Sequence, residues 1–580
     1  MINRLAREAE MELARSGAKL SCSEWMQMYT KHPRHPSRAW SFAGHEYQIA
    51  IADDWHPNQI MNKAAQLGVT DTMLRKGLYF LDQNQGANLI YTMPSDKLMK
   101  VFCKIRLKAI LEGCDRVTNL AELQDVARKR DSLSAIQVGR SWLLMKATIG
   151  ERVGISDPAD CVMIDEWNAS DIGNVSKYRS RLQHCQNPIF VGFSNPTVPE
   201  YGTDEYYRVS DENEVVIKCP YCGEWQTLDW EPEEMWTHEH LPSIRKREEL
   251  KETLPDTKGD EWGFACRACE RELCYDPSIK WEWRAAYELP RVIEGVSHNW
   301  RGRRLSLLNG WAWQRAQSIV QFFFDMAAKK GFQIAYNMVI GKPFVSGAGK
   351  ITPKMMAQCE DATLKWKTGS TEGTIVGADQ GDKIHRIVVI EPIMLANGML
   401  GPRVIHIEEH RGDLFDGPSS TGRLREISEQ YNSIMTVFDA QPNMEAAERL
   451  CKSGLGRYWR AFYPPQDRVV MVEPKRVDQD NPDYVVTISR NSLMSRVARM
   501  VQSGDARWPV LGDAPGGAGA EFCLQMMKPT RMMDPNNEGR EIWVGTPDHF
   551  RHAMNYACAG LIIMGNISPV SVHTPGIIKM

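Results

Sequence analysis

The sequence lacks any long apolar run. No stretch of about 18 consecutive apolar residues occurs along its 580 residues, so we expect no membrane-spanning helix. The first residues, MINRLAREAEMELARS, are charged throughout and lack the apolar centre of a secretion signal. Internal repeats and low-complexity tracts are also absent, which argues against a repeat architecture and against long unstructured regions.

An excess of either charge is missing too. Lys and Arg number 70 and Asp and Glu number 73, which gives a formal net charge of −3. A DNA-binding surface would therefore have to be a local basic patch. Hydrophobic residues at 43% and charged residues at 25% are ordinary for a globular protein, and the length allows two or three domains. Most of the 14 cysteines are expected in the core.

Apolar strand-like runs alternate with helical stretches in two separate parts of the chain. The runs are NLIYTMP, CVMIDEW and IFVGFSNP in the first part, and TIVGAD, IHRIVVIEP, VIHIEE and IMTVFDA in the second. Such alternation predicts α/β domains with parallel strands. The predicted organisation is a helical arm at 1–40, an α/β core at 41–200, a metal-binding insertion at 201–285, a helical segment and linker at 286–370, a second α/β domain at 371–565 and a tail at 566–580.

The segment MNKAAQLGVTDTML, residues 61–74, precedes a predicted helix. A phosphate-binding loop needs backbone N–H groups at a helix start, a lysine for the phosphates and a hydroxyl for Mg²⁺. Gly68 and Thr70 supply a glycine and a hydroxyl, but Val69 stands where the usual lysine would be. From these residues alone, an ordinary loop before a helix is the better interpretation.

The run ADCVMIDEWN ends a predicted buried strand in Asp165 and Glu166. At the carboxyl end of such a strand the aspartate can hold Mg²⁺ and the glutamate can polarise an attacking water. A strand that ends in a solvated loop is the alternative. The next predicted strand ends in Ser194-Asn195-Pro196-Thr197, which is either a sensor of a γ-phosphate or a plain Asn-Pro turn.

Two Cys-x-x-Cys pairs are the strongest single signal by spacing. They are Cys219 with Cys222 and Cys266 with Cys269. Each pair can present two thiolates to a tetrahedral Zn²⁺, and a site with four thiolates has no open position for catalysis. We therefore expect a structural zinc site. Redox pairs or free thiols are the alternatives, and Cys274 lies close by as a spare.

Several acidic and histidine residues in the second half fit a phosphodiesterase site. Asp379 and Asp439 end the strands TIVGAD and IMTVFDA, and Asp548, His549 and His552 lie in a predicted helix. Positions 548 and 552 share a helix face because they are four residues apart. Two strand-end aspartates with a helix-borne acid or histidine predict two divalent ions about 4 Å apart. Taken singly, each residue is more often a plain turn or cap.

In order and context these motifs resemble the large subunits of tailed-phage terminases, particularly the branch of the phage lambda enzyme. The resemblance covers about 20 to about 565 and implies a P-loop ATPase domain that drives DNA packaging. KAAQLGVTD is similar to that branch's phosphate loop, in which the lysine comes at the start of the loop. The implied nucleotide contacts are Tyr47, Gln48, Lys63, Gln66, Gly68, Thr70, Asp165, Ser194 and Asn195, with Glu166 as the catalytic residue and Arg152 as an arginine finger.

The resemblance also implies an RNase H-like nuclease from about residue 371. Asp379 and Asp439 match its first and second metal-binding aspartates. At the third position relatives have an acid four residues before the Tyr of Tyr556-Ala557, whereas this chain has His552. Asp548, one turn earlier, is the candidate for the missing carboxylate. Because Mg²⁺ prefers oxygen ligands and imidazole suits Mn²⁺ better, this departure leaves the metal and the cleavage open.

The same resemblance implies partners and cofactors. The partners are double-stranded viral DNA, a small terminase subunit, a portal protein and further copies in a ring, in the cytoplasm of an infected bacterium and not in the mature virion. The cofactors are ATP, Mg²⁺ or Mn²⁺, and Zn²⁺. Contacts with DNA phosphates are expected, unless these side chains are a solvated helix face, from Lys475, Arg476, Arg490, Arg496 and Arg499.

Two other functions stay open on the sequence alone. One is a helicase- or restriction-type ATPase that also has a nuclease domain and works without a portal. The other is a zinc-bearing DNA-binding or assembly scaffold with an inactive ATPase. The missing lysine at Val69 and the histidine at His552 are the residues that favour the scaffold.

Overall fold

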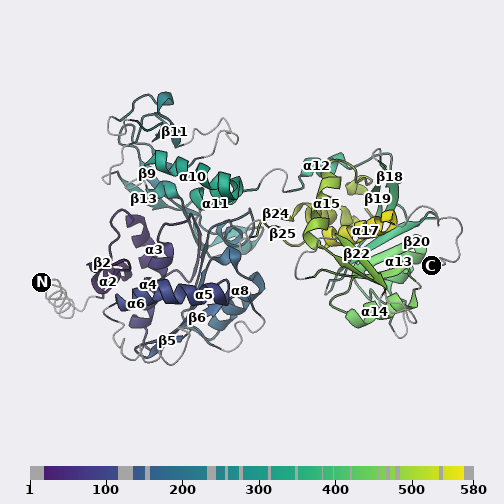
Figure 1. Ribbon diagram of the computed structural model, residues 1–580, viewed down its shortest axis with the longest axis horizontal. Helices are drawn as coiled ribbons and strands as arrows, with labels where there is room; N and C mark the ends of the chain where they lie inside the picture. The colour runs from purple at the N-terminus through teal and green to yellow at the C-terminus, as the bar shows by residue number, and fades with distance from the viewer. Residues whose placement is uncertain are drawn as a thin grey trace. The chain divides into compact units, whose positions relative to one another are not determined.

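The structure is a computed structural model in which the chain divides into two compact units, with the boundary between Phe344 and Val345 (Figure 1). No helix in the described part of the chain is both long enough and apolar enough to cross a bilayer. Apart from the side chains of Arg476 and Asn566, the structure describes residues 19–114, 116, 135–150, 157–230, 243–254, 259–273, 279–310, 315–345, 350–381, 383–395, 398–417, 421–454, 456–464, 471–476, 484–534 and 540–566.

A ten-stranded sheet forms the centre of the first unit. Seven neighbouring strands are parallel, in the order β9, β16, β3, β8, β7, β4, β6. Beyond them β5 runs antiparallel to β6, and β10 and β13 run antiparallel to β9. The strands are β3 Asn58–Lys63, β4 Asn88–Met93, β5 Ala135–Val138, β6 Ser141–Ala147, β7 Cys161–Asp165, β8 Ile189–Ser194, β9 Asn213–Lys218, β10 Trp225–Thr227, β13 Trp281–Arg284 and β16 Arg301–Leu305.

Helices and small hairpins complete the first unit. The α-helices are α2 Cys22–Tyr29, α3 Ile49–Asp53, α4 Val69–Gln83, α5 Asp96–Phe102, α6 Lys108–Glu112, α8 Ile172–Arg179, α9 Thr203–Tyr207, α10 Ala316–Lys330 and α11 Phe332–Ile340. A π-helical segment, η2 Cys103–Leu107, joins α5 to α6. The hairpins pair β1 Lys31–His32 with β2 His35–Ala39, β11 Ile244–Lys246 with β12 Trp262–Phe264, and β14 Arg291–Ile293 with β15 Val296–His298.

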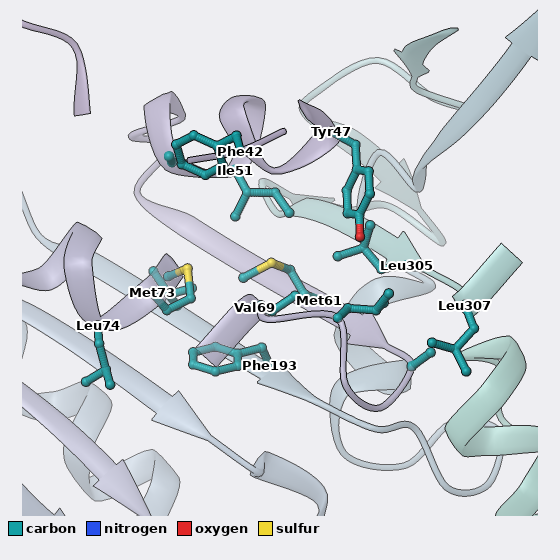
Figure 2. Close-up of a cluster of buried hydrophobic side chains, with 14 of the residues drawn as sticks. Phe42, Tyr47, Ile51, Met61, Val69, Met73, Leu74, Phe193, Leu305 and Leu307 are labelled. Atoms are coloured by element: carbon teal, nitrogen blue, oxygen red, sulfur yellow. The ribbon is translucent and has the colours of Figure 1, made fainter. Parts of the chain in front are cut away.

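The central strands are covered on both faces of the sheet. Every residue of β7 and β8 is buried, as expected for parallel strands between two layers. Successive side chains of a strand point to opposite faces. Val162 and Ile164 accordingly lie in one core, while Cys161 and Met163 lie in the other. Figure 2 shows this second core around the start of α4, where Val69 is packed among apolar side chains.

The sheet extends beyond the expected α/β core at 41–200. Strands β9, β10 and β13 come from 201–285, the predicted metal-binding insertion, and β16 comes from 286–370, the predicted helical segment and linker. Strand β16 is the immediate neighbour of β3, so part of the segment 286–370 lies inside the sheet. The helical part of that prediction corresponds to α10 and α11.

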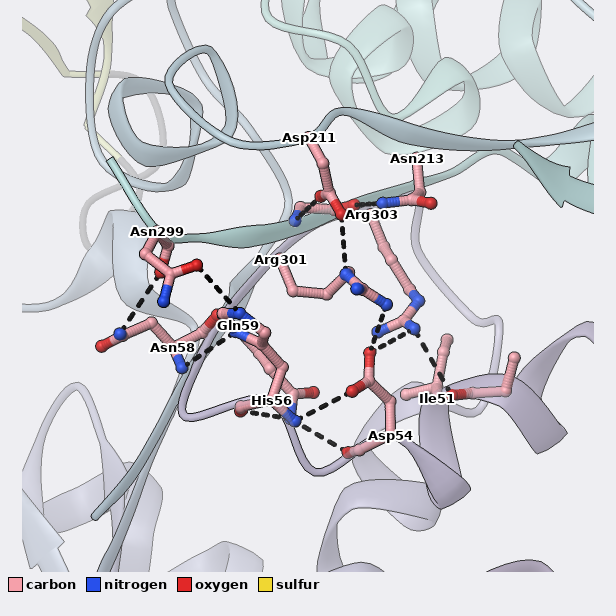
Figure 3. Close-up of polar contacts among 12 residues, drawn as sticks. Ile51, Asp54, His56, Asn58, Gln59, Asp211, Asn213, Asn299, Arg301 and Arg303 are labelled. Atoms are coloured by element: carbon pink, nitrogen blue, oxygen red, sulfur yellow. Dashed lines mark hydrogen bonds and ion pairs between the residues drawn. The ribbon is translucent and has the colours of Figure 1, made fainter. Parts of the chain in front are cut away.

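The sequence does not predict strand β16, because its sequence RGRRL contains three arginines. Arg303 and Arg301 both pair with Oδ2 of Asp54, at 2.6 Å and 3.1 Å (Figure 3). Arg304 pairs with Glu214 of β9. These ion pairs offset the cost of placing charged groups inside the sheet. Hydrophobic periodicity cannot detect such a strand.

The second unit contains a seven-stranded mixed sheet in the order β19, β18, β17, β20, β21, β23, β22. Strands β17, β18 and β19 are antiparallel, β17, β20, β21 and β23 are parallel, and β22 runs antiparallel to β23. A separate pair is β24 Thr530–Met533 with β25 Glu541–Val544. The strands of the sheet are β17 Thr374–Asp379, β18 His385–Met394, β19 Leu400–His410, β20 Ser433–Asp439, β21 Tyr458–Phe462, β22 Val472–Arg476 and β23 Tyr484–Ile488.

One long helix packs directly on the first strand of this sheet. A Cβ atom on Gly377 of β17 would lie 2.1 Å from the carbonyl oxygen of Ala553 and 2.4 Å from the nitrogen of Ala557. Glycine at this position therefore lets α17 approach β17 closely, next to Asp379. The helices of the unit are α12 Pro353–Gln358, α13 Arg423–Gln430, α14 Met444–Ser453, α15 Arg490–Gln502, α16 Ala518–Met527 and α17 His549–Asn566.

Candidate functional site

A loop with left-handed residues joins β3 to α4 and forms the candidate phosphate loop. Gln66 and Gly68 have φ angles of 61° and 79°, and Gly68 is the N-cap of α4. Glycine adopts this conformation without steric strain. The neighbouring strand β16 holds the start of the loop, because the nitrogen of Ala64 donates to the carbonyl of Leu305 at 2.7 Å. The N–H groups of the first turn of α4 are the kind that binds phosphate at helix N-termini.

Lys63, the last residue of β3, lies beside the Asp-Glu pair that ends β7. Its Nζ is 3.2 Å from Oε1 of Glu166, and the lysine side chain is 8% exposed while that of the glutamate is 37% exposed. Burial lowers the pKa of Lys63, but the carboxylates of Glu166 and Asp165 outweigh this effect, so the pKa is raised and the lysine is charged. The site therefore has a lysine although Val69 occupies the usual lysine position.

Asp165 is enclosed at the end of β7. The hydroxyl of Tyr91 donates to its Oδ2 at 2.8 Å, and the backbone nitrogen of Glu166 donates to its Oδ1 at 2.9 Å. Burial raises the pKa of Asp165 to about 6, with a contribution from Glu166, while Lys63 and the hydroxyls of Tyr91 and Thr70 lower it. A buried carboxylate beside a threonine hydroxyl offers the hard oxygen ligands that Mg²⁺ prefers.

The end of β8 and the turn after it contact both Lys63 at the end of β3 and the segment that follows β7, because β8 lies between β3 and β7. The side-chain nitrogen of Asn195 donates to the carbonyl of Lys63 at 2.8 Å. The backbone nitrogen of Asn168 donates to the hydroxyl of Ser194 at 3.2 Å. Glu166 itself has a φ of 51°, a conformation that is strained for a residue with a side chain and that clusters at functional sites. The predicted γ-phosphate turn thus lies at the phosphate loop.

Gln48 is bound to the phosphate loop by both atoms of its amide group. Its Nε2 donates to the carbonyl of Leu67 at 2.5 Å, and the hydroxyl of Thr72 donates to its Oε1 at 2.5 Å. Tyr47 is buried, with its hydroxyl 3.1 Å from Nδ1 of His45. The expected contact of Tyr47 and Gln48 with the nucleotide stays a prediction. Arg152, the expected arginine finger, lies outside the described residues.

The four cysteines meet in one cluster. Their sulfur atoms all lie within 4.8 Å of one another, with Cys219 and Cys269 3.8 Å apart and Cys222 and Cys266 3.7 Å apart. A tetrahedral zinc with Zn–S bonds of about 2.3 Å requires sulfur–sulfur distances of about 3.8 Å. Nε2 of Gln226 donates to the sulfur of Cys266 at 3.2 Å, which orients that ligand. The donor set and its geometry fit a closed structural zinc site.

Replacing Cys219 with serine is expected to remove zinc and lower the unfolding temperature of the protein by about 5–10 °C, because the metal links two otherwise separate turns. Elemental analysis should find about one zinc ion per chain in the wild type and little in Cys219→Ser. Cys185→Ser is the control, since Cys185 is partly exposed and is not a member of the cluster. Full zinc content in Cys219→Ser would contradict the assignment.

Asp379 and Asp439 lie at the ends of adjacent parallel strands, β17 and β20. Nε2 of Gln380 donates to the carbonyl of Asp439 at 3.2 Å and ties the two strand ends together. Burial raises the pKa of Asp439 to about 6, and the nearby charge of Asp379 adds to the rise. Nδ1 of His549 lies 2.7 Å from Oδ2 of Asp379, and this hydrogen bond raises the pKa of His549. Carboxylate oxygens are the ligands that divalent cations such as Mg²⁺ prefer.

His552 and Asp548, the two candidates for the third metal ligand, are bound to each other. Nε2 of His552 lies 3.1 Å from Oδ2 of Asp548, and Nδ1 of His552 lies 2.9 Å from the hydroxyl of Tyr463. Nη2 of Arg490 also lies 3.3 Å from Oδ2 of Asp548. Both ring nitrogens of the histidine and one oxygen of the aspartate are thus engaged. In the described part of the chain, the four cysteines are the only group that meets the spacing of a metal site with three or more ligands.

Three tyrosines that were not predicted as site residues complete the two sites. Tyr91 binds Asp165, Tyr463 binds His552, and the hydroxyl of Tyr556 bonds to Asp439 and lowers its pKa against the larger effect of burial. Tyr91 lies within the run NLIYTMP, so a polar atom inside an apolar strand was the available signal.

Two of the basic residues expected to contact DNA, Arg490 and Lys475, form contacts with other residues of the protein. Arg490 is bound to Asp548 and to the carbonyl of Trp543. Nζ of Lys475 lies 3.2 Å from Glu473. Arg499 on α15 is exposed, Arg496 is half-buried, and the side chain of Arg476 is outside the described set. Their contact with DNA stays a prediction.

Residues 39–280 match the family model described as phage terminase large subunit gpA, ATPase domain. The matched range contains the phosphate loop, the Asp-Glu pair and both cysteine pairs. The chain carries the ATPase domain of the phage terminase large subunits. No curated protein sequence matches it.

Three solved structures of phage large terminases, or of their domains, are similar to this chain. The large terminase of bacteriophage HK97 is 9% identical, with a TM-score of 0.48 over 93% of this chain and 98% of that chain. The ATPase domain of a Thermus phage large terminase is 10% identical, with a TM-score of 0.29 over 51% of this chain and 95% of that one. The large terminase nuclease of the thermophilic phage G20c, solved with bound magnesium, is 12% identical, with a TM-score of 0.23 over 35% and 93%.

The family match confirms the predicted terminase ATPase domain over residues 39–280, and the predicted α/β fold class is confirmed. The ATPase domain has the predicted parallel α/β sheet, and the second unit has a mixed α/β sheet in which three antiparallel strands are followed by parallel ones. The four-cysteine cluster lies within the matched residues 39–280, and it contains the two Cys-x-x-Cys pairs of the predicted zinc site. Membership of the lambda-like branch stays a prediction.

Proposed function

We propose that the chain is a DNA-packaging motor that hydrolyses ATP to translocate double-stranded viral DNA into a procapsid and cleaves the DNA with a metal-dependent nuclease. The contact between Lys63 and Glu166 supports this most directly. It joins the phosphate loop to the Asp-Glu pair at the carboxyl edge of a parallel sheet, the edge at which such sheets bind ligands. A scaffold without ATPase activity has no need of a charged lysine buried at this place.

In the proposed ATPase reaction, backbone N–H groups of the loop and Lys63 hold the phosphates. Asp165 and Thr70 hold Mg²⁺, which neutralises the phosphate charge when bound. Glu166 orients and polarises the attacking water, because its carboxylate is partly exposed and needs only to release Lys63. Asn195, which is bonded to Lys63, would respond to the γ-phosphate through the loop.

In the proposed nuclease reaction, Asp379 and Asp439 would hold divalent ions, whose chemistry when bound would be to lower the pKa of water and to stabilise charge on a phosphate. Gln380 keeps the two strand ends in register. His549 orients Asp379 through its Nδ1 and presents a half-exposed ring beside the carboxylate. Because both ring nitrogens of His552 are engaged, we propose that His552 and Asp548 become ligands only if their contacts with Tyr463 and Arg490 are given up.

The proposed setting follows the terminase family. A ring of copies would act on the portal of a procapsid in the cytoplasm of an infected bacterium, helped by a small terminase subunit. An arginine from a neighbouring copy would stabilise the transition state of ATP hydrolysis. Arg152 is the candidate from the sequence.

The test is the activity of the purified full chain. ATP hydrolysis should rise when linear double-stranded DNA is added, and a supercoiled plasmid should be cut in Mg²⁺ or Mn²⁺. No hydrolysis in the presence of DNA and procapsids would favour the zinc-bearing scaffold. Strand displacement on short forked DNA would favour a helicase-type enzyme.

A further inference from the structure

Arg106 lies at the rim of the candidate nucleotide site, in the π-helical segment η2. Such segments are rare and are frequent at functional sites, because the extra residue in the turn changes the direction of the side chains. Nε of Arg106 lies 3.5 Å from Oδ1 of Asp71, and Asp71 directly follows Thr70 in the first turn of α4. This distance exceeds that of a hydrogen bond, so the ion pair is loose.

Two aromatic rings, those of Phe102 and Tyr91, link Arg106 to Asp165 at the end of β7. The Arg106 guanidinium lies 5.9 Å from the ring centre of Phe102, and Phe102 stacks on Tyr91 with ring centres 5.8 Å apart and an interplanar angle of 17°. The hydroxyl of Tyr91 donates to Asp165 at 2.8 Å. Burial is the largest influence on the pKa of Lys63 and of Tyr91, and the charge of Arg106 also acts to lower both pKa values.

The carboxylates around the phosphate loop indicate that binding of ATP needs a second cation beside Lys63. Lys63 is already paired with Glu166, and Asp71 and Asp165 add two further carboxylates. Magnesium–ATP is itself negatively charged, so binding it next to three carboxylates and one lysine is electrostatically unfavourable. The Arg106 side chain is 50% exposed, and its guanidinium has five N–H donors of which the loose pair with Asp71 engages one. A planar fork of this kind matches phosphate oxygens.

We propose that Arg106 is the second cation of the nucleotide site and that it leaves Asp71 to contact the γ-phosphate of ATP bound in the same subunit. This inference rests on the proposed ATPase function and adds a residue that no motif in the sequence indicated. It also gives Asp71 a role, since that carboxylate holds the arginine near the loop in the absence of nucleotide.

The test compares Arg106→Ala and Arg106→Lys with Lys104→Ala, which changes another exposed cation of the same π-helical segment. Binding of ATPγS and of ADP is measured without DNA, together with kcat and KM for ATP. Arg106→Ala should weaken ATPγS binding by about 10-fold or more and leave ADP binding within about twofold, because ADP has no γ-phosphate. The kcat should fall by about 10²-fold or more. Arg106→Lys should recover part of the loss, and Lys104→Ala should match the wild type.

Three results would overturn the inference. Equal weakening of ADP and ATPγS would mean that Arg106 does not distinguish the γ-phosphate. Unchanged nucleotide binding with a lowered affinity for double-stranded DNA would make Arg106 a DNA contact instead. The third result is a lower unfolding temperature in Arg106→Ala that Arg106→Lys does not restore, together with equal weakening of ADP and ATPγS binding. That result would mean that Arg106 has a structural role. If the wild type itself binds no ATPγS, the proposed ATPase function fails along with the inference.

Discussion

Glu166→Gln is expected to lower the rate of ATP hydrolysis by about 10²–10⁴-fold and to leave ATPγS binding within a few-fold of the wild type. The glutamine oxygen can still accept a hydrogen bond from Lys63, so the contact between the phosphate loop and β7 is retained. An amide cannot take a proton from the attacking water or polarise it as a carboxylate does. The measurement is DNA-stimulated phosphate release at saturating ATP, with nucleotide binding measured in parallel.

Glu212→Gln is the matched control for that experiment. Glu212 also has a left-handed backbone, with a φ of 50°, and is also paired with a cation, since its Oε1 lies 2.6 Å from Nη1 of Arg291. The same substitution there should leave hydrolysis unchanged. If Glu166→Gln hydrolyses ATP at the wild-type rate, Glu166 is not the catalytic carboxylate and the assignment of the Asp-Glu pair fails.

The second large effect is expected at the nuclease site. Asp379→Asn and Asp439→Asn should each reduce plasmid cleavage by at least about 10²-fold, because each removes a carboxylate ligand and several kcal/mol of transition-state stabilisation. ATP hydrolysis should be retained, since the nucleotide site lies in the other compact unit. Cleavage is measured with Mg²⁺ and separately with Mn²⁺, by the loss of supercoiled plasmid over time.

Asp416→Asn is the control in the same unit, because Asp416 is paired with Arg425 outside the site. It should cut like the wild type. Cleavage that survives both active-site substitutions would exclude Asp379 and Asp439 as the metal ligands. A preference for Mn²⁺ that disappears in His552→Gln would show that the imidazole leaves Tyr463 and Asp548 to bind metal.

The parts of the structure that the sequence predicts well are those in which an apolar run ends in a polar residue. The strands that end in Asp165, Asp379 and Asp439 follow from the mostly apolar runs CVMI, IVGA and IMTVF that each precede an acid, and the structure has β7, β17 and β20 at those places. The four-cysteine cluster follows from spacing alone. In each case the local sequence determines both the element and the position of the functional side chain at its end.

What the sequence does not predict depends on partners far along the chain. Strand β16 has three arginines and becomes a buried strand only because Asp54 and Glu214 pair with them. Asp548 looks like a free carboxylate until Arg490 is found beside it. Such contacts have no periodicity, so reasoning from local pattern misses them. The extension of the first sheet beyond residue 200 is missed for the same reason.

The position of β16 also bears on how the protein is made. β3, which ends in Lys63, lies between β8 and β16. A chain that has emerged from the ribosome only as far as residue 280, the end of the family match, still has β3 as an open edge and Asp54 without its arginines. Open edges pair readily with other chains. The nucleotide site of the nascent protein is therefore completed after the cysteine module has been synthesised, and the cell must keep the unfinished sheet from aggregating in the interval.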